Sequence, residues 1–589
     1  MTDTFPYLPL GALAPEQDGK RRFRLWAPLP KKIELVLFRD GQPTLFPMQP
    51  ETNGYLISDA VEAPAGTAYG FYHNGKRDKL YPDPASRYQP DGVHGKSEVV
   101  DLPPVEPGNW RGRPLSEAVI YELHIGTFTE EGTFAAATER LDYVRDLGVT
   151  MLEIMPLNQT SGERNWGYDG VLPFALFQAY GRPEDFRRFV DAAHERGIAV
   201  LVDVIYNHLG PEGNYLPAFF PIFTEKHHTP WGAAINFDDA HADGVRNYWL
   251  QNVRLWLEAY GADGLRIDAV HAIKDYSAKH FLEEVSELAD RIGKEQDRTL
   301  VTIAECDLNA PRYLQSRKRG GYGMSGQWVD EFHHAIHGLL TGEARGYYED
   351  FGHVEQLAKA LKDGYVYTGQ YSPHRKRNFG RRPANDIRPA QMVVFLQNHD
   401  QVGNRMEGDR LISTIGPDKY LLGAATYLLS PFTPLIFMGE EYGEERPFPY
   451  FVHHGDPELI QAVRKGRAAE FAAFQTEGHH VPDPQATETF ASAKLSWQPD
   501  ERIASFYREA LQLRSAGGGD HSFADISVDR AGNLITWNIR GGAFTACGNY
   551  GDEPLSIEVD STELLLASNG ATLENNHLEL PAWGFAAIA

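Results

Sequence analysis

The chain has 589 residues, with 56 Lys and Arg against 81 Asp and Glu, so its formal net charge at pH 7 is −25. Because this excess of negative charge repels phosphate backbones, nucleic acid is excluded as an expected partner. The length exceeds that of one ordinary domain, and we expect a large central domain with smaller ones beside it.

The N-terminus and the cysteines indicate the compartment. Residues 1–20, "MTDTFPYLPLGALAPEQDGK", contain no basic segment followed by an apolar one, and no run of 18 uncharged apolar residues occurs in the chain. The two cysteines, Cys306 and Cys547, are far apart and lie in neither a CxxC pair nor a zinc spacing. We therefore predict a cytoplasmic protein with no membrane contact and no disulfide scaffold.

The first predicted elements are short strands. Runs of alternating character such as "RRFRLWAP" (21–28) and "KKIELVLFRD" (31–40) are separated by Gly, Pro and Asn, a pattern typical of a β-sandwich. The Pro-rich segment "DLPPVEPGNWRGRP" (101–114) then reads as a connector. This pattern predicts an N-terminal β-sandwich over residues 1–105.

Strands and helices alternate through the middle of the chain. Amphipathic helices are expected at 133–148, 183–197 and 245–261. The buried strand candidates are "VIYELHIG" (119–126), "TMLEIMP" (150–156), "AVLVDVIYNH" (199–208), "GLRIDA" (264–269), "LVTIAEC" (300–306), "GQWVDEF" (326–332), "MVVFLQNHD" (392–400) and "PLIFMGEE" (434–441). Eight such units predict an α/β fold, a (β/α)8 barrel over residues 106–515 with loop insertions.

The end of the chain changes character again. A helix over 502–516 closes the predicted barrel, and "GGGD" (517–520) opens a stretch of short strands. We expect a small C-terminal β-domain over residues 516–589.

Ionisable residues, with two asparagines beside them, gather at the predicted strand ends. They are Asp203, Asn207 and His208 after the third strand, Arg266 and Asp268 after the fourth, Glu305 after the fifth, Asp330 and Glu331 after the sixth, and Asn398, His399 and Asp400 after the seventh. Catalytic groups of such barrels lie at this edge, so Asp268, Glu305 and Asp400 should converge. A retaining glycosidase needs a nucleophilic carboxylate and a protonated acid about 5 to 5.5 Å apart.

The charges around these carboxylates suit that task. Side chains alternate along a strand, so Arg266 and Asp268 point to the same side and are expected to pair. The arginine would keep Asp268 ionised, while neighbouring negative charge would favour the protonated form of Glu305.

Other interpretations of these residues remain. A single carboxylate at a strand end is more often a helix cap, and His208 and His399 could be satisfied core histidines. Asp203, His208 and Asp268 could imitate metal ligands, but no HxH, HExxH or facial-triad spacing supports this. We predict no metal and no organic cofactor.

Four segments, "DVIYNH", "GLRIDAVH", "IAEC" and "FLQNHD", resemble the signatures of the α-amylase family of glycoside hydrolases. The resemblance implies that Asp268 is the nucleophile, that Glu305 is the general acid and base, and that Asp400 is the third carboxylate, which stabilises the transition state. The substrate-binding positions that it implies are Tyr168, Asp203, His208, Arg266, His271 and His399, and Asn207 is expected to support the loop.

Stretches outside these signatures, such as "YELHIGTFTEEGTF", "RNWGYDGVLPFALFQAYG" and "HHTPWGAAINFD", are similar to family members that act on maltooligosyltrehalose. Those members cut the α-1,4 bond next to the terminal trehalose and release trehalose and a maltooligosaccharide, without a cofactor. A pocket for trehalose must lie on the leaving-group side, where we expect Glu331, Phe332 and Trp231 to contact it.

Three alternatives stay open at this point. A glycogen branching or debranching enzyme of the same superfamily also joins an N-terminal β-sandwich to this barrel, and residues 1–105 resemble the carbohydrate-binding modules of such enzymes. A non-catalytic carbohydrate-binding protein would have lost at least one of the three carboxylates. A metal-dependent hydrolase on the same barrel would lose activity with a chelator.

Overall fold

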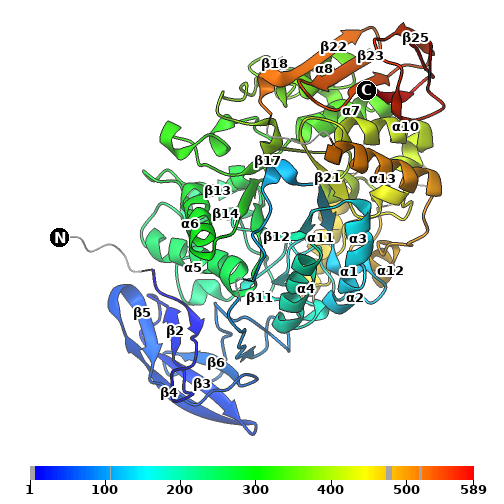
Figure 1. Cartoon of the computed structure of the whole chain (residues 1–589). Helices are drawn as coiled ribbons and strands as arrows, with labels where there is room; N and C mark the ends of the chain where they lie inside the picture. Colours follow the sequence, from blue (N-terminus) through cyan, green and yellow to red (C-terminus); the bar gives the residue numbers. More distant parts are fainter. Residues whose placement is uncertain (1–6, 106–107, 472–480, 517–520) are drawn as a thin grey trace.

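The structure is a computed structural model that describes residues 7–105, 108–471, 481–516 and 521–589. Its centre is a closed barrel of eight parallel strands in the order β12-β15-β16-β17-β20-β21-β8-β9 (Figure 1). The strands are β8 Ile120–Leu123, β9 Met151–Ile154, β12 Ala199–Val204, β15 Gly264–Ile267, β16 Val301–Ala304, β17 Gly326–Trp328, β20 Met392–Phe395 and β21 Thr433–Phe437. Seven lie within a predicted run and β21 begins one residue before its run, so the (β/α)8 barrel is confirmed.

The barrel strands are apolar because helices cover their outer faces and packed side chains fill the interior. Every residue of these eight strands is buried. Charged residues inside them therefore stand out. Asp203 of β12 is the register partner of Arg266 of β15, and Glu122 of β8 is that of Glu153 of β9.

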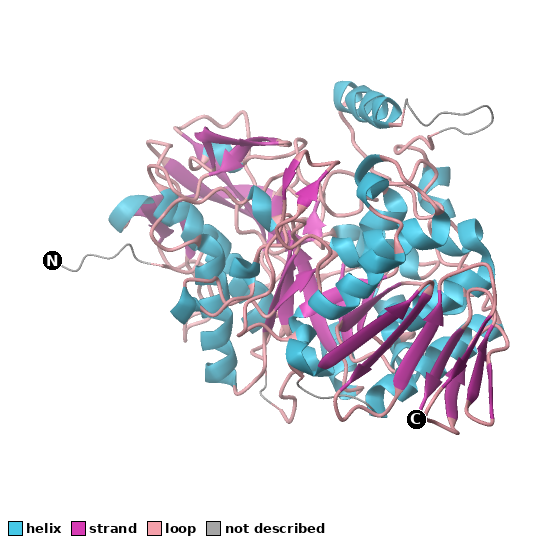
Figure 2. Ribbon diagram, turned by 90° about the horizontal axis from the view of Figure 1, so that it is seen from above, coloured by secondary structure: helices cyan, strands magenta, loops and turns pink. Residues whose placement is uncertain are grey.

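Helices surround the barrel (Figures 1 and 2). They are α1 Ile125–Phe128, α2 Phe134–Thr138, α3 Leu141–Leu147, α4 Pro183–Glu195, α5 Ala242–Arg254, α6 Phe281–Gln296, α7 Asp330–Thr341, α8 Val354–Asp363, α9 His399–Gly403, α10 Leu411–Leu428, α11 Pro457–Glu470, α12 Thr487–Ser492 and α13 Glu501–Ala516. The helix predicted over 133–148 is two short helices, α2 and α3. The one predicted over 245–261 is α5 followed by a π-helical turn, Leu255–Ala259.

Three hairpins are inserted into the barrel. They are β10 Asn158–Gln159 with β11 Leu172–Leu176, β13 Phe223–Thr229 with β14 Gly232–Ile235, and β18 Tyr371–Ser372 with β19 Arg377–Asn378. The first two lie between β9 and β15, and the third lies between β17 and β20. In the part of the chain described here, no helix is long and apolar enough to cross a bilayer.

Seven N-terminal strands form one antiparallel sheet in the order β1-β2-β5-β4-β3-β6-β7. They are β1 Gly11–Ala12, β2 Phe23–Trp26, β3 Ile33–Arg39, β4 Gln42–Pro50, β5 Tyr55–Ser58, β6 Ala68–His73 and β7 Ser97–Glu98. The first part of β4 pairs with β3 and its end pairs with β5. The rings of Phe23 and Tyr69 lie 4.8 Å apart although β2 and β6 are not sheet neighbours. The sheet therefore folds over into two layers around one core.

This sheet packs tightly against helix α5 of the barrel. A Cβ atom built on Gly244 would lie 1.9 Å from the ring of Trp26, so only glycine permits this approach. The Asn247 amide also donates to the Tyr55 hydroxyl over 2.7 Å, and the Tyr248 hydroxyl donates to the Pro84 carbonyl over 2.8 Å. Apolar and polar contacts together fix the N-terminal strands on the barrel.

The C-terminal strands form two antiparallel sheets on the opposite side of the molecule (Figures 1 and 2). One contains β22 Ile526–Ala531, β23 Leu534–Ile539, β24 Thr545–Asn549, β26 Leu564–Ala567 and β29 Phe585–Ile588, and the other contains β25 Leu555–Glu558, β27 Thr572–Glu574 and β28 His577–Leu580. The Trp537 indole donates to the Leu429 carbonyl over 3.1 Å and joins them to the barrel. The predicted domain limits near residues 105 and 515 stay a prediction.

Candidate active site

Two of the three predicted carboxylates follow neighbouring barrel strands directly. Asp268 comes after β15 and Glu305 after β16, and these strands pair in parallel. The chain turns sharply at Ala269, whose φ is 38°, and its backbone N–H donates to Oε2 of Glu305 over 2.5 Å. The turn thus positions the Glu305 carboxyl beside the backbone that carries Asp268.

Arg266 is the cationic centre of the site. It is fully buried, and its Nη1 donates to Oδ2 of Asp203 over 2.7 Å and to Oδ1 of Asp268 over 2.9 Å. Its guanidinium lies 4.2 Å from the ring centroid of Trp328, a cation–π contact. The pairing of Arg266 with Asp268 that the sequence predicts is therefore present.

Both carboxylate oxygens of Asp268 are held by donors. Arg266 contacts Oδ1, and the Asn207 amide donates over 2.8 Å to Oδ2 and over 2.8 Å to the Asp268 backbone carbonyl. Asn207 thus supports this turn, as expected. Two fixed donors orient the carboxylate as a nucleophile requires.

The surroundings of Glu305 favour its protonated carboxyl form. Burial raises the pKa of Glu305 well above its ordinary value, and although Arg266 opposes this, the negative charge of Asp268 adds to it. Asp330 and Asp400 add further negative charge. Burial also raises the pKa of Asp330 itself to about 7, with Asp307 and Asp400 contributing. Glu305 therefore holds its proton while Asp268 faces a cation.

A second polar chain runs from Asp203 across the barrel. The Tyr168 hydroxyl donates to Oδ2 of Asp203 over 2.7 Å and lies 2.7 Å from Nε2 of His399, and the rings of Tyr168 and His399 stack. Nδ1 of His399 lies 2.5 Å from Oε1 of Glu122. Burial alone would lower the pKa of His399, but Asp400 and Glu122 raise it to about 9. His399 is thus a cation at neutral pH.

His208 and Trp231 extend the site outward. Nδ1 of His208 contacts Oδ1 of Asn207 over 2.5 Å, and Nε2 donates to the Tyr168 carbonyl over 3.0 Å. The Trp231 ring stacks on His208 with centroids 4.8 Å apart and remains 52% exposed. Trp231 follows β13, at the turn of the inserted hairpin, so this hairpin supplies an aromatic surface beside the predicted nucleophile.

Comparisons with known proteins agree with this geometry. The family described as "Alpha amylase, catalytic domain" matches residues 80–219. A malto-oligosyltrehalose trehalohydrolase of Saccharolobus solfataricus is 42% identical over 94% of this chain and 95% of its own. The chain belongs to the malto-oligosyltrehalose trehalohydrolase family.

Two further proteins are similar to this chain over nearly its whole length. A malto-oligosyltrehalose trehalohydrolase of Rhizobium sp. (strain M-11) is 44% identical over 97% of this chain and 98% of its own. A crystal structure described as a putative alpha amylase from Salmonella typhimurium has a TM-score of 0.87 and 38% identity, covering 98% of this chain and 99% of that one. The chain is thus an α-amylase family glycoside hydrolase, and a branching or debranching enzyme is not favoured.

Two predicted contacts of this trehalohydrolase family member lie on α7 and have partners within the protein. Phe332 is fully buried and its ring is 6.0 Å from that of Phe432, so it faces the core and cannot contact a sugar as predicted. Glu331 accepts backbone N–H groups of Val366 (2.9 Å) and Tyr367 (2.8 Å), so its carboxylate holds a loop. The cause is that α7 begins at Asp330, so these side chains follow helical and not strand geometry.

His271 lies in another group of possible ligands. Its ring, the Cys306 thiol and the Asp307 carboxylate have ligand atoms within 4.8 Å of one another, in the part of the chain described here. Such a donor set suits a metal such as Zn²⁺. However, Asp307 already pairs with Arg375 over 3.1 Å, and burial raises the pKa of the Cys306 thiol, so it stays protonated. Asp203 and Asp268, the other acids considered as metal ligands, both pair with Arg266, and its positive charge occupies the place that a metal ion would need.

Sequence reasoning missed two buried acids in the trehalohydrolase barrel. Glu122 accepts the His399 backbone N–H over 2.9 Å in addition to contacting its ring. Burial raises the pKa of the adjacent Glu153 well above its ordinary value, and Glu122 adds to the rise, so Glu153 carries a proton. The available signal was a single acid within each of two apolar runs, "VIYELHIG" and "TMLEIMP".

Proposed function

We propose that the protein cleaves the α-1,4-glucosidic bond next to the terminal trehalose of maltooligosyltrehalose, releasing trehalose and a maltooligosaccharide. It would then act in trehalose biosynthesis as a retaining glycoside hydrolase. The observation that carries the reaction type is Asp268, held by Arg266 and Asn207, next to Glu305, whose pKa is raised by burial. The names of the full-length relatives support the substrate.

In the first step the Asp268 carboxylate attacks the anomeric carbon of the glucose unit at the cleaved bond. The bond from that carbon to the leaving oxygen breaks, and Glu305 gives its proton to this oxygen, so trehalose leaves as a neutral sugar. A covalent bond between Asp268 and the glucosyl unit remains. Arg266 and Asn207 hold Asp268 on the line of attack.

In the second step Glu305, now ionised, takes a proton from water. The resulting hydroxyl oxygen bonds to the anomeric carbon as the bond to Asp268 breaks, and a maltooligosaccharide leaves with its original anomeric configuration. Glu305 is protonated again. Every atom of the cycle comes from substrate and water, so no cofactor is needed.

The remaining residues bind the sugar at the cleaved bond. Asp400 would accept hydrogen bonds from ring hydroxyls, and the Tyr168 ring would stack on the sugar. The other proposed substrate contacts are Asp203, His208, Arg266, His271 and His399. Arg266 and His399 carry positive charges that offset the negative charges of the carboxylates. The site therefore stays close to neutral overall as positive charge develops on the sugar in the transition state.

Trp231 is the proposed contact on the trehalose side. An exposed indole held by stacking on His208 provides a flat surface with one polar edge. Glu331 would act there indirectly by holding the loop at Val366 and Tyr367. We also propose the division into residues 1–105, 106–515 and 516–589, and a cytoplasmic location.

The test is product analysis after incubation with maltopentaose and, separately, with a maltooligosaccharide that ends in trehalose. Release of free trehalose with little attack on maltopentaose is the expected result. Proton NMR of the new reducing end should show the α-anomer first. Preferential cleavage or rearrangement of maltopentaose would overturn the substrate assignment, and a first-formed β-anomer would overturn the mechanism.

A further inference from the structure

Tyr276 exposes its ring far more than other aromatic residues do. It is 77% exposed, the highest value among the large hydrophobic side chains that the structure describes as exposed. It lies on the loop from β15 to α6, eight residues after Asp268. Because this loop leaves the carboxyl end of a barrel strand, Tyr276 lies on the catalytic face.

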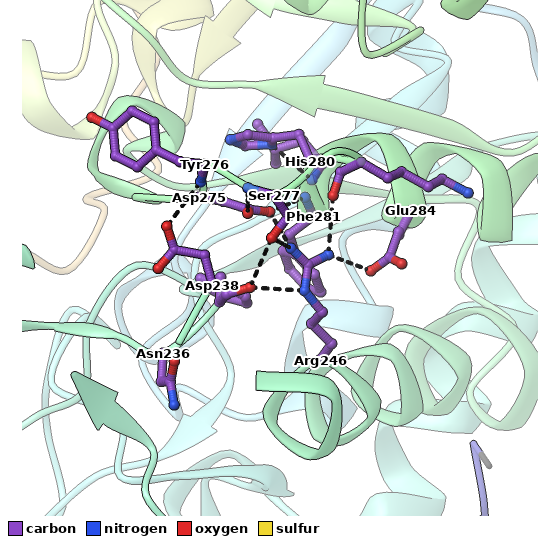
Figure 3. A network of polar contacts seen from close by, with 12 residues as sticks. Asn236, Asp238, Arg246, Asp275, Tyr276, Ser277, His280, Phe281 and Glu284 are labelled. Carbon is purple, nitrogen blue, oxygen red and sulfur yellow. Dashed lines mark hydrogen bonds and ion pairs between the residues drawn. The ribbon is translucent and has the colours of Figure 1, made fainter. Parts of the chain in front are cut away.

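The loop around Tyr276 is fixed by a buried arginine. Arg246 of α5 donates to Oδ2 of Asp275 over 2.5 Å and to Oγ of Ser277 over 2.9 Å, the residues on either side of Tyr276 (Figure 3). It also pairs with Glu284 of α6 over 2.8 Å. Removing the charges of Arg246 and Asp275 from water costs free energy. The ion pair is therefore better explained by the loop conformation that it fixes than by a gain in stability alone.

A second anchor joins this loop to the β13–β14 hairpin. The Tyr276 backbone N–H donates to Oδ2 of Asp238 over 3.0 Å, and Asp238 also pairs with Lys226 and His227 of β13. The His227 ring lies 5.2 Å from the Tyr276 ring. Trp231 lies at the turn of the same hairpin, so these contacts join the two elements that carry the exposed rings.

The backbone of Tyr276 is therefore held on both sides while its ring points away from the polar network (Figure 3). A surface tyrosine without a binding role would not need these hydrogen bonds to its backbone and to its neighbours. An exposed ring on a backbone that is already fixed loses little entropy when a ligand packs on it. The apolar face of a pyranose ring is a ligand of the required shape.

We propose that Tyr276 forms an outer subsite, on which a glucose ring of the substrate stacks away from the cleaved bond. The inference rests on the proposed function and extends it to a residue outside the family signatures. The ligand is an α-glucose unit, supplied either by the maltooligosaccharide chain or by the terminal trehalose. The loop over 275–277 and the β13–β14 hairpin build this surface together.

The test compares Tyr276→Ala, Tyr276→Phe and a control, Leu29→Ala, which removes a 52% exposed apolar side chain between β2 and β3. Substrates are trehalose-ended chains with two and with six additional glucose units. Stacking of one ring is worth about 0.5–1.5 kcal/mol, so Tyr276→Ala should raise KM roughly 2- to 12-fold with little change in kcat. Tyr276→Phe, which keeps the ring, and Leu29→Ala should match the wild type.

The chain-length series and inhibition by free trehalose identify the glucose unit. A larger KM effect on the long chain places a chain glucose on Tyr276. An equal effect on both chains, with trehalose inhibition weakened by the same factor, places trehalose there. Unchanged KM and unchanged inhibition in Tyr276→Ala would overturn the inference, and so would an equal loss in Tyr276→Phe.

Wild-type product analysis in the same experiment separates this inference from the proposed function. Trehalose release by the wild type with normal kinetics of Tyr276→Ala refutes only the subsite. If the wild type releases no trehalose, the proposed function fails. Isothermal titration of maltohexaose into the wild type and Tyr276→Ala then tests the subsite, and equal affinities refute it.

Discussion

The guanidinium of Arg266 donates to the Asp268 carboxylate over 2.9 Å from the same strand end. The two residues are two positions apart, so their side chains leave the strand on the same side. The same nitrogen of Arg266 also contacts Asp203 on the neighbouring strand over 2.7 Å. One buried cation thus fixes two carboxylates, and each has a second donor: the Asn207 amide for Asp268 and the Tyr168 hydroxyl for Asp203.

Replacing Asp268 by Ala should remove turnover without unfolding the protein. The variant cannot form the covalent intermediate, so we expect kcat to fall by more than about 10³-fold. Trehalose release measured by chromatography is the readout, with circular dichroism to confirm the fold. Asp560→Asn, in an exposed turn of the C-terminal strands, is the matched control and should retain full activity. Near-normal turnover of Asp268→Ala would show that another group attacks.

Replacing Glu305 by Gln should remove the acid limb of catalysis. The raised pKa keeps Glu305 protonated to higher pH than an ordinary glutamate, so wild-type kcat/KM should fall as the pH rises through that pKa. The variant should lose this limb. It should be much less impaired on α-maltosyl fluoride, whose leaving group needs no proton, and an equal loss on both substrates would rule out an acid role for Glu305.

The charge on His399 should make stability depend on pH. Its pKa lies at about 9 in the fold against 6.5 ordinarily, so this contribution to stability is complete below pH 6.5 and is lost as the pH rises through about 9. Glu122→Gln removes one of the charges that raise the pKa of His399. The wild-type thermal midpoint should therefore fall between pH 6.5 and pH 9.5 more steeply than that of Glu122→Gln. Parallel curves for the two proteins would contradict this linkage.

Much of this barrel was predictable because the features that mark its strands lie within short stretches of sequence. Strands buried on both faces are apolar runs, and all eight runs form strands. The pairing of Arg266 with Asp268 followed from strand alternation alone, which needs no knowledge of distant segments.

The parts that were not predictable depend on closure of the barrel or on where an element begins. Glu122 and His399 are 277 positions apart, and they meet only because β21 and β8 close the barrel beside β20. Phe332 was expected to contact sugar because the predicted strand ran to residue 332. The strand ends at Trp328 and α7 starts at Asp330, which turns Phe332 into the core.

Removing the Arg246 guanidinium should loosen the loop around Tyr276. In Arg246→Ala the buried Asp275 carboxylate loses its cation, which typically costs about 3–5 kcal/mol. Tyr276→Ala, at an exposed position, should cost less than about 0.5 kcal/mol. Denaturant unfolding of both variants measures the difference, and hydrogen exchange at residues 275–281 should rise only in Arg246→Ala. Equal stabilities would mean that this ion pair does not hold the loop.

The contact between Gly244 and Trp26 bears on how the protein melts. Helix α5 presents one side to the barrel strands and the other to the N-terminal strands, and the indole occupies the space that any larger side chain at 244 would need. If either part unfolded alone, the contact surface on the other part would therefore be exposed to water. We therefore expect the N-terminal strands and the barrel to unfold in a single cooperative transition, and a chain shortened to the barrel to expose an apolar, aggregation-prone surface around Gly244.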